Sequence, residues 1–509
     1  MTCLAVVPIF VNAGAALLPA LVAGVASALA MLFKPRELWQ LCRRRPMTPV
    51  VVMTCAAAVG MGGWWVMGGD QESAKARNPA GIDWIKVAEQ IASGEGKAEL
   101  ATSERHASVF RFDYSRCGHD GGASPVKLHR KWRFDADGAT ILSSPLVANG
   151  RVYGATYFQD VAGSAGEVFC LDAATGEAIW RTAADGDVAF KPFFSSPALS
   201  EDGKYVLIGQ GLHPDKDCDL ICLKADSGKV HWRVKTPLHI EGSPAVKGDM
   251  VVAGAGAIEG PDHKPTGDPG MVIAVRISDG KVLWTYAVND PESSPAISDE
   301  GIVFIGSGFQ GNAVIALRTE PDEQLRARGL SRLLWKTPTP YPVTGAVTLA
   351  ADLVIVGAGN SDYVNAAPDP AGLVMALDVR TGQVRWKKEM GDAVLGPVAA
   401  RDGKVICPVR TGHVVALDQK DGKELWRVAI SGNVPILAGP AFTGTHVYAV
   451  SGDGVLAVVD VDGPTVLEKH TVNSTPGTMG LSLSSPIVVG GHVFVGSETG
   501  GVSCYGEGR

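Results

Sequence analysis

The chain has 509 residues and a formal net charge of −7 at pH 7. The first 69 residues carry five basic side chains and one acidic side chain, so residues 70–509 carry a net charge of −11. This acidic balance, without a basic stripe, argues against a nucleic-acid-binding protein. The length would allow several domains, and the 62 glycines are typical of a β protein that is rich in turns.

The N-terminal 69 residues predict a membrane anchor. Residues 3–33 are apolar and uncharged, and they are long enough to span a bilayer with some tilt. A second, shorter candidate covers residues 49–67. The loop at 34–46 is basic, and the positive-inside rule places it in the cytoplasm. We therefore predict two transmembrane helices, with the rest of the chain on the extracytoplasmic (periplasmic) side. A signal peptide followed by a buried segment is the alternative.

Residues 70–123 are more polar and predict a linker. Within them, Ile82–Ile91 has the pattern of a short amphipathic helix. No domain is expected here, because the repeated units begin only at about residue 124.

A repeated unit occupies residues 124–509. Each copy starts with a small or polar residue and Pro, continues through apolar runs, and ends with Ala-Leu-Asp, a Thr-Gly turn and a Trp. A unit of about 40–50 residues that consists of short strands is typical of a β-propeller blade. The Trp, which we expect to pack between neighbouring blades, recurs at Trp132, Trp180, Trp232, Trp284, Trp335, Trp386 and Trp426.

The number of unit starts gives the number of blades. Eight starts are present, at 143–145, 195–197, 242–244, 293–295, 344–346, 395–397, 438–440 and 484–486. The seventh unit has Leu467 at the Trp position, and the eighth stops at Arg509 before its last strand. The segment 131–134 resembles that missing strand. We predict an all-β, eight-bladed propeller over 124–509, closed by strand 131–134 and preceded by transmembrane helices.

The cysteines predict neither a disulfide framework nor a redox or haem site. Cys170, Cys222 and Cys504 occupy the small-residue position that alanines fill in other units, so we expect buried thiols. No CxxC or CxxCH motif occurs.

Strand parity predicts where a binding site would lie. In a four-stranded antiparallel blade, the second turn and the link to the next blade emerge at the same end of the ring. The long connections are all second turns, at 159–166, 211–219, 256–270 and 359–372. Loops gathered on a rigid scaffold are expected to bind partners. The candidate binding residues on them are His213, Asp215, Asp262, His263, Asp362, Tyr363 and Asn365.

These loop residues do not predict a metal or a catalytic site. His213, Asp215, Asp217 and Asp219 alternate like the start of a calcium loop, but Leu220 stands where such a loop needs Gly. We expect a solvated acidic loop there. A nucleophile elbow, a phosphate loop and an HExxH motif are all absent from the sequence.

Two repeat copies, ALDVRTGQVRW (376–386) and ALDQKDGKELW (416–426), closely resemble the tryptophan-docking repeat of the PQQ-repeat propellers. FRFDYSRCGHDGGASP (110–125) is similar to the lead-in of many such propellers. One branch of this superfamily, the quinoprotein dehydrogenases, holds PQQ and Ca²⁺ on the ring axis. The other branch is the BamB-like scaffolds, which present loops to a partner protein without a cofactor. This chain departs from both, because it has neither adjacent cysteines nor a lipobox.

We therefore favour a membrane-anchored, extracytoplasmic propeller that binds a protein or a cell-envelope component through its loops, without catalysis and without a cofactor. The alternative is a PQQ-dependent dehydrogenase with a divergent active site, which would require PQQ and Ca²⁺. A third hypothesis is a sensor that couples ligand binding to the paired helices. The loop at 34–46 leaves little room for its cytoplasmic output domain.

Overall fold

The structure is a computed structural model that describes residues 109–160, 163–212, 215–256, 270–309, 311–477 and 480–508. The two predicted transmembrane segments, their basic loop and the predicted helix at 82–91 lie outside the described residues. Among the residues that are described, no helix has both the length and the apolar character needed to cross a membrane.

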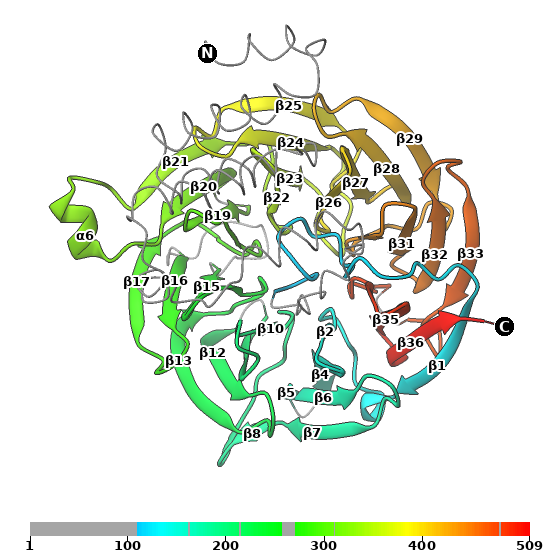
Figure 1. Ribbon diagram of the computed structural model, residues 1–509, viewed down its shortest axis with the longest axis horizontal. Coiled ribbons are helices and arrows are strands. Elements are labelled where there is room, and N and C mark those ends of the chain that lie inside the picture. Colours follow the sequence, from blue (N-terminus) through cyan, green and yellow to red (C-terminus); the bar gives the residue numbers. More distant parts are fainter. Residues whose placement is uncertain are drawn as a thin grey trace, which may run out of the picture. The chain divides into compact units, whose positions relative to one another are not determined.

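Within the described residues, the strands form eight four-stranded sheets arranged in a ring, which confirms the predicted eight-bladed propeller (Figure 1). Each blade is an antiparallel meander whose first strand lies nearest the axis. Blade 1 consists of β2 (Leu146–Ala148), β3 (Arg151–Ala155), β6 (Val168–Asp172) and β7 (Ala178–Thr182). Blade 2 consists of β10 (Ala198–Leu199), β11 (Tyr205–Gly209), β12 (Lys216–Lys224) and β13 (Val230–Leu238). Blade 3 consists of β14 (Ala245–Lys247), β15 (Met250–Ala255), β16 (Met271–Arg276) and β17 (Val282–Ala287).

The remaining blades repeat this order. Blade 4 consists of β18 (Ala296–Ile297), β19 (Ile302–Ser307), β20 (Ala313–Arg318) and β21 (Leu333–Pro338). Blade 5 consists of β22 (Thr348–Ala350), β23 (Leu353–Gly359), β24 (Gly372–Asp378) and β25 (Val384–Glu389). Blade 6 consists of β26 (Ala399–Arg401), β27 (Lys404–Val409), β28 (His413–Asp418) and β29 (Glu424–Ala429). Blade 7 consists of β30 (Ala441–Phe442), β31 (His446–Val450), β32 (Val455–Asp460) and β33 (Val466–Thr471).

Blade 8 closes the ring with strands from both ends of the propeller. It consists of β34 (Ile487–Val489), β35 (His492–Ser497), β36 (Gly501–Glu507) and β1 (Leu128–Phe134). β1 pairs antiparallel with β36, with Trp132 opposite Cys504. The predicted closing strand 131–134 is therefore confirmed and begins earlier, at Leu128. Because every blade now has a neighbour on both sides, no sheet is left at an open end of the ring.

Smaller elements lie in the connections between the blade strands. A hairpin of β4 (Phe158–Asp160) and β5 (Gly163–Ala165) lies in the second turn of blade 1, and β8 (Ala184–Asp185) pairs with β9 (Val188–Ala189) in the link to blade 2. A 3₁₀ turn, η2 (Ala136–Gly138), follows β1. The short helix α6 (Asp322–Ala327) lies between β20 and β21.

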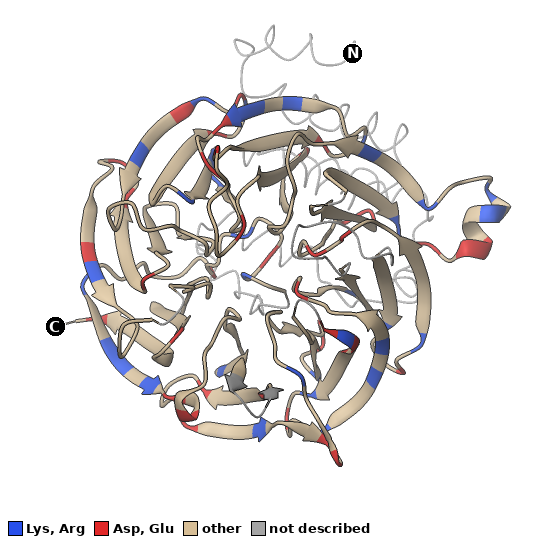
Figure 2. Cartoon of the chain, turned by 180° about the vertical axis from the view of Figure 1, so that it is seen from behind, with Lys and Arg blue, Asp and Glu red and all other residues tan. Residues whose placement is uncertain are grey.

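The core lies between the blades. The inner strands are apolar on both faces, as β23 shows with every residue buried. In Figure 2, many Lys and Arg residues lie on the outermost strands, whereas most Asp and Glu residues lie on turns and loops. Cys170, Cys222 and Cys504 are buried free thiols, as predicted. Burial raises the pKa of Cys170 to about 11, so its thiol stays neutral.

The recurring Trp joins each blade to the next. On the outermost strand, Trp386 lies opposite the small residue Ala376 of its own sheet. Its indole reaches the turn of the following blade, where its Nε1 donates a 2.9 Å hydrogen bond to the carbonyl of Gln419. Gly422 in that turn leaves room for the ring, because a Cβ there would lie 2.5 Å from the indole. The same donation to the next blade is made by Trp132, Trp180, Trp232 and Trp335.

Trp284 is docked differently. The following blade carries α6 instead of a tight Gly turn, and the guanidinium of Arg332 lies 4.4 Å from the centre of the Trp284 indole. A cation over an indole face is attracted by the ring's negative quadrupole. The longer connection therefore replaces a backbone hydrogen bond with a cation–π contact.

The sequence assigned Leu467 to the Trp position of the seventh blade, and this assignment is wrong by one residue. In blade 6, Ala416 lies opposite Trp426, and the equivalent pair in blade 7 is Val458 opposite Glu468. A bulge at the start of each of these two outer strands leaves the residue just before Trp426 or Glu468 outside the ladder. Leu467 occupies that bulge and is 42% exposed. Glu468 therefore stands where the other blades have Trp.

Replacing Gly422 by Ala is expected to destabilise the protein more than replacing Gly403 by Ala. Both glycines have positive φ, 73° and 74°, so both variants carry the backbone cost, about 1–2 kcal/mol. Only at Gly422 would the new methyl group also collide with Trp386, since nothing lies within 4 Å at Gly403. Thermal and urea unfolding of the two full-length variants should differ by about 2 kcal/mol. Equal losses would contradict the docking role of Gly422.

Candidate functional site

The segment before β1 crosses the ring axis. It makes backbone hydrogen bonds to the innermost strands of four consecutive blades: Leu349 to Tyr114, Ala400 to Ser115, Phe442 to Cys117 and Val488 to Gly118, the first of each pair donating its N–H. Residues 109–120 belong to the segment 70–123 that the sequence predicted to be a linker, and they pack within the propeller. We call residues 109–120 the axial plug.

Two buried arginines hold the axial plug in place. Arg116 donates from Nη2 to the carbonyl of Pro295 at 2.7 Å and from Nε to that of Val347 at 3.1 Å. Arg111 donates to the carbonyls of Arg116 and Pro440. Burial lowers the pKa of Arg116 to about 10 and that of Arg111 to about 9, so both remain charged at neutral pH. Backbone carbonyls thus stabilise the two cations in place of water.

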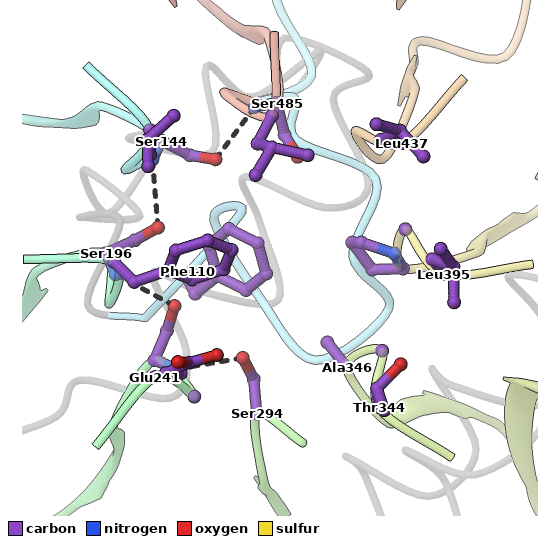
Figure 3. A pocket seen from close by; sticks show the side chains of 18 of the residues that line it. Phe110, Ser144, Ser196, Glu241, Ser294, Thr344, Ala346, Leu395, Leu437 and Ser485 are labelled. Atoms are coloured by element: carbon purple, nitrogen blue, oxygen red, sulfur yellow. Dashed lines mark hydrogen bonds between the residues drawn. The ribbon is translucent and has the colours of Figure 1, made fainter. Parts of the chain in front are cut away.

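In five of the eight blades, the residue that precedes the blade-start proline is a serine, and these serines form a serine belt around the axis. The hydroxyl oxygen of each serine accepts a hydrogen bond from the backbone N–H of the preceding blade. In the described part of the ring, these bonds are 2.8–3.0 Å long and run to Ser196, Ser243, Ser294, Ser485 and Ser144. The repeated Ser-Pro signature therefore reflects contacts between neighbouring blades around the axis (Figure 3).

An axial cavity of about 70 Å³ lies between this belt and the loops. Its lining includes Phe110 of the axial plug and several members of one repeat position, the third residue before the blade-start proline. These members are Leu142, Phe194, Glu241, Glu292, Leu437 and Leu483. The cavity is much smaller than the roughly 300–1,000 Å³ of typical small-molecule sites.

Aromatic rings narrow the mouth of this cavity. Phe194 and Tyr363 come from different blades and meet edge to face, with ring centres 5.9 Å apart. The Tyr363 hydroxyl donates to the carbonyl of Leu395 at 3.5 Å, and burial raises the pKa of Tyr363 well above its usual value. The cavity thus combines aromatic and aliphatic side chains with polar ones, and it faces the end of the ring that carries the second turns and the interblade links.

One side of the mouth is acidic. Glu241 and Glu292 occupy the same repeat position in adjacent blades. His239 Nε2 lies 2.9 Å from Glu292 Oε1, and both side chains are buried. One ligand atom from each of His239, Glu241 and Glu292 lies within 4.8 Å of the others. Among the described residues, this is the group of His, Cys, Asp and Glu side chains that converges closely enough to hold a metal ion.

The candidate residues from the sequence fall into three groups. Tyr363 lines the axial cavity. Asp362 accepts hydrogen bonds from the N–H groups of Val364 and Asn365 at 2.7 and 2.5 Å, so it shapes its own turn. Asp215 similarly accepts from the N–H of Leu212. His213, Asp262 and His263 lie outside the described residues.

The sequence predicted a solvated acidic loop at 213–219, and this is wrong for Asp219, which is buried and pairs with Arg233. Asp215 instead accepts a hydrogen bond from the N–H of Leu212 in its own loop. Sequence reasoning missed His239, Glu241 and Glu292. The two glutamates stand out when the repeats are aligned, because the other cavity-lining residues at this repeat position are apolar.

The fold, the Trp docking and the serine belt define an eight-bladed propeller of the PQQ-repeat type, as the sequence predicted. The sequence profile of the family described as outer membrane protein assembly factor BamB matches residues 129–367 and 370–506. The chain belongs to this family. It is 25% identical over 356 residues to the outer membrane protein assembly factor BamB of Yersinia pestis, covering 67% of this chain and 80% of that protein.

Solved structures share the fold. BamB from Moraxella catarrhalis matches with a TM-score of 0.52 and 16% identity, over 75% of this chain and 97% of that chain. The quinohemoprotein alcohol dehydrogenase from Comamonas testosteroni matches with a TM-score of 0.59 and 15% identity, over 81% of this chain and 82% of that chain. At these identities the likeness shows the fold alone, which scaffolds and enzymes have in common.

Replacing Arg116 by Met is expected to cost about 3–5 kcal/mol of folding stability, because three carbonyls would lose a charged donor in a buried site. Arg326 on α6 is exposed, and the matched variant Arg326→Met should change stability by less than about 0.5 kcal/mol. Chemical unfolding of the full-length variants measures the difference. Limited proteolysis should also cut Arg116→Met near residue 116 sooner than the wild type. Similar behaviour of both variants would show that the axial plug does not depend on Arg116.

Proposed function

We propose that the protein is a non-catalytic scaffold of the cell envelope, which binds a partner protein through the loop end of its propeller. Membership of the BamB family supports this proposal. By the same analogy, the partner takes part in the assembly of outer membrane proteins. The propeller lies on the extracytoplasmic side of a membrane, and the N-terminal segments anchor it there.

Exposed apolar side chains on the loop end carry the proposal. Val364 is 67% exposed, Val188 is 56% exposed and Phe158 is 45% exposed. They come from the second turn of blade 5, the link after blade 1 and the second turn of blade 1. These connections emerge at the same end of the ring as the axial cavity. Phe158 and Val188 belong to blade 1 and Val364 to blade 5, so they offer separate apolar contacts to a protein surface that spans this end.

The second turn of blade 5 is held in place by Arg410, which also favours protein binding. The Arg410 guanidinium donates to the carbonyls of Asp362 and Val364, at 3.1 and 3.4 Å. Arg410 also lies 3.8 Å from the carboxylate of Asp392, and both are buried. A loop fixed in this way loses little conformational entropy on binding.

The narrow axis supports the absence of a quinone cofactor. Its free volume of about 70 Å³ is several-fold below the roughly 300–1,000 Å³ of small-molecule sites. Phe110, Phe194 and Tyr363 line this space. A tricyclic quinone would have to displace these rings, and the residues at the axis do not fit it.

The scaffold proposal predicts that Val364→Asp weakens partner binding. Full-length tagged protein, expressed in its native host, is cross-linked in intact cells, and the captured envelope proteins are quantified by mass spectrometry. A buried carboxylate at an apolar contact should reduce capture of a true partner about tenfold or more. Val384→Asp on the outer wall, where Val384 is 48% exposed, is the matched control and should leave capture unchanged. Loss of capture in both variants, or in neither, would contradict binding by the loop end.

Titration of the full-length protein with PQQ and Ca²⁺ tests the dehydrogenase alternative. We expect no saturable heat at micromolar PQQ with millimolar Ca²⁺, because Phe110, Phe194 and Tyr363 line a free axial space of only about 70 Å³. Binding of one PQQ per chain, tighter than about 10 µM (about 7 kcal/mol), would overturn the scaffold proposal. Screening of alcohol substrates would then follow.

A further inference from the structure

We infer that His239, Glu241 and Glu292 bind a divalent transition-metal ion, of which Zn²⁺ is the best probe, at the mouth of the axial cavity. This inference does not depend on the proposed scaffold function. It rests on the convergence of three ligand side chains, on the backbone that brings them together and on the charge they carry.

The geometry leaves little movement for metal binding. The three ligand atoms lie within 4.8 Å of one another, and His239 Nε2 is already 2.9 Å from Glu292 Oε1. With metal–ligand bonds of about 2.0–2.2 Å, two ligands of one tetrahedral ion lie about 3.3–3.6 Å apart. The ligand atoms must therefore shift by about 1 Å, and Glu241, the partly buried member of the three, has the most freedom to move.

The backbone around the three ligands is built for close approach. Gly256 lies against the pair, and a Cβ there would come within 2.7 Å of His239 Nε2 and 2.9 Å of Glu292 Oε1. Gly242, next to Glu241, has the same role, because its Cβ would lie 2.6 Å from the carbonyl of Glu292. Any larger side chain at these positions would push the ligands apart.

The serine belt fixes the two glutamates relative to each other. Glu241 and Glu292 each stand two residues before a belt serine. Those serines, Ser243 and Ser294, are joined by a 2.9 Å hydrogen bond from the N–H of Ser243 to the hydroxyl of Ser294. Both carboxylates therefore project from backbone that is already ordered, which is the condition for tight metal binding without a large ordering cost.

The charge of the cluster favours a divalent ion. The two carboxylates of the cluster come from adjacent blades and place two acidic groups close together. A divalent cation can bind both carboxylates and take the imidazole of His239 as its third ligand. Imidazole with carboxylates suits Zn²⁺ better than Ca²⁺ or Mg²⁺, which prefer sites made entirely of oxygen ligands. Three protein ligands leave a fourth position for water.

Zinc titration of the full-length protein tests the inference. The protein is purified in detergent, stripped with a chelator and titrated with Zn²⁺ in competition with a chromophoric chelator. Wild type should bind one more zinc per chain than the double variant Glu241→Gln/Glu292→Gln. The single variant Glu241→Gln should weaken that site at least tenfold. Its side chain is only partly buried, and circular dichroism checks that the variant is folded. Co²⁺ in place of Zn²⁺ should give a visible absorption band that the double variant lacks.

Glu468→Gln is the matched control, because Glu468 also lies beside a histidine, with its carboxylate 3.2 Å from His470 Nε2. That pair stands on the outer wall, and the described residues supply it with no third metal ligand. Its zinc stoichiometry and affinity should equal those of wild type. The inference is overturned if wild type and the folded double variant bind the same number of zinc ions with the same affinity, or if wild type binds none.

Discussion

The pairing of β1 with β36 is the constraint on which the rest of the structure depends. It joins a strand from the beginning of the propeller to the last strand of the chain, so the ring closes only when both ends meet. The axial plug comes shortly before β1 in sequence, and its backbone hydrogen bonds tie it to the innermost strands of blades 5–8. Closing the ring and filling its axis are thus two consequences of one N-terminal segment.

The fold could be predicted because each blade repeats the same local signals, and each signal corresponds to one interaction. The serine before the blade-start proline joins two blades at the axis, as Ser243 and Ser294 do. The turn glycine, such as Gly422, receives the Trp of the preceding blade. The wrong assignment of the Trp position in blade 7 also arose from these repeated signals. Matching by hydrophobicity selects Leu467, whereas counting from the aspartate that ends the preceding strand selects Glu468, as the strand register does.

The candidate site was harder to predict, because it has no contiguous signature. Glu241 and Glu292 come from different units, and only the ring brings them together. The position of the axial plug could not be predicted for another reason. Its sequence resembles a propeller lead-in, but its two arginines are buried although arginine is usually exposed. What stabilises Arg116 there is a set of carbonyls from other blades, which the sequence near residue 116 cannot reveal.

The repeat also explains how the axis can change its chemistry without a change of fold. The third residue before each blade-start proline reaches the axial mouth in most blades, whatever its side chain is. Leu142, Leu437 and Leu483 make the mouth apolar, and the two glutamates make one side of it acidic. Because the serine belt fixes the backbone beneath this position, exchanging these side chains alters the polarity of the mouth while the blade contacts stay intact. A scaffold and a metal site can therefore coexist on one ring, since the outer loops and the axial position vary independently.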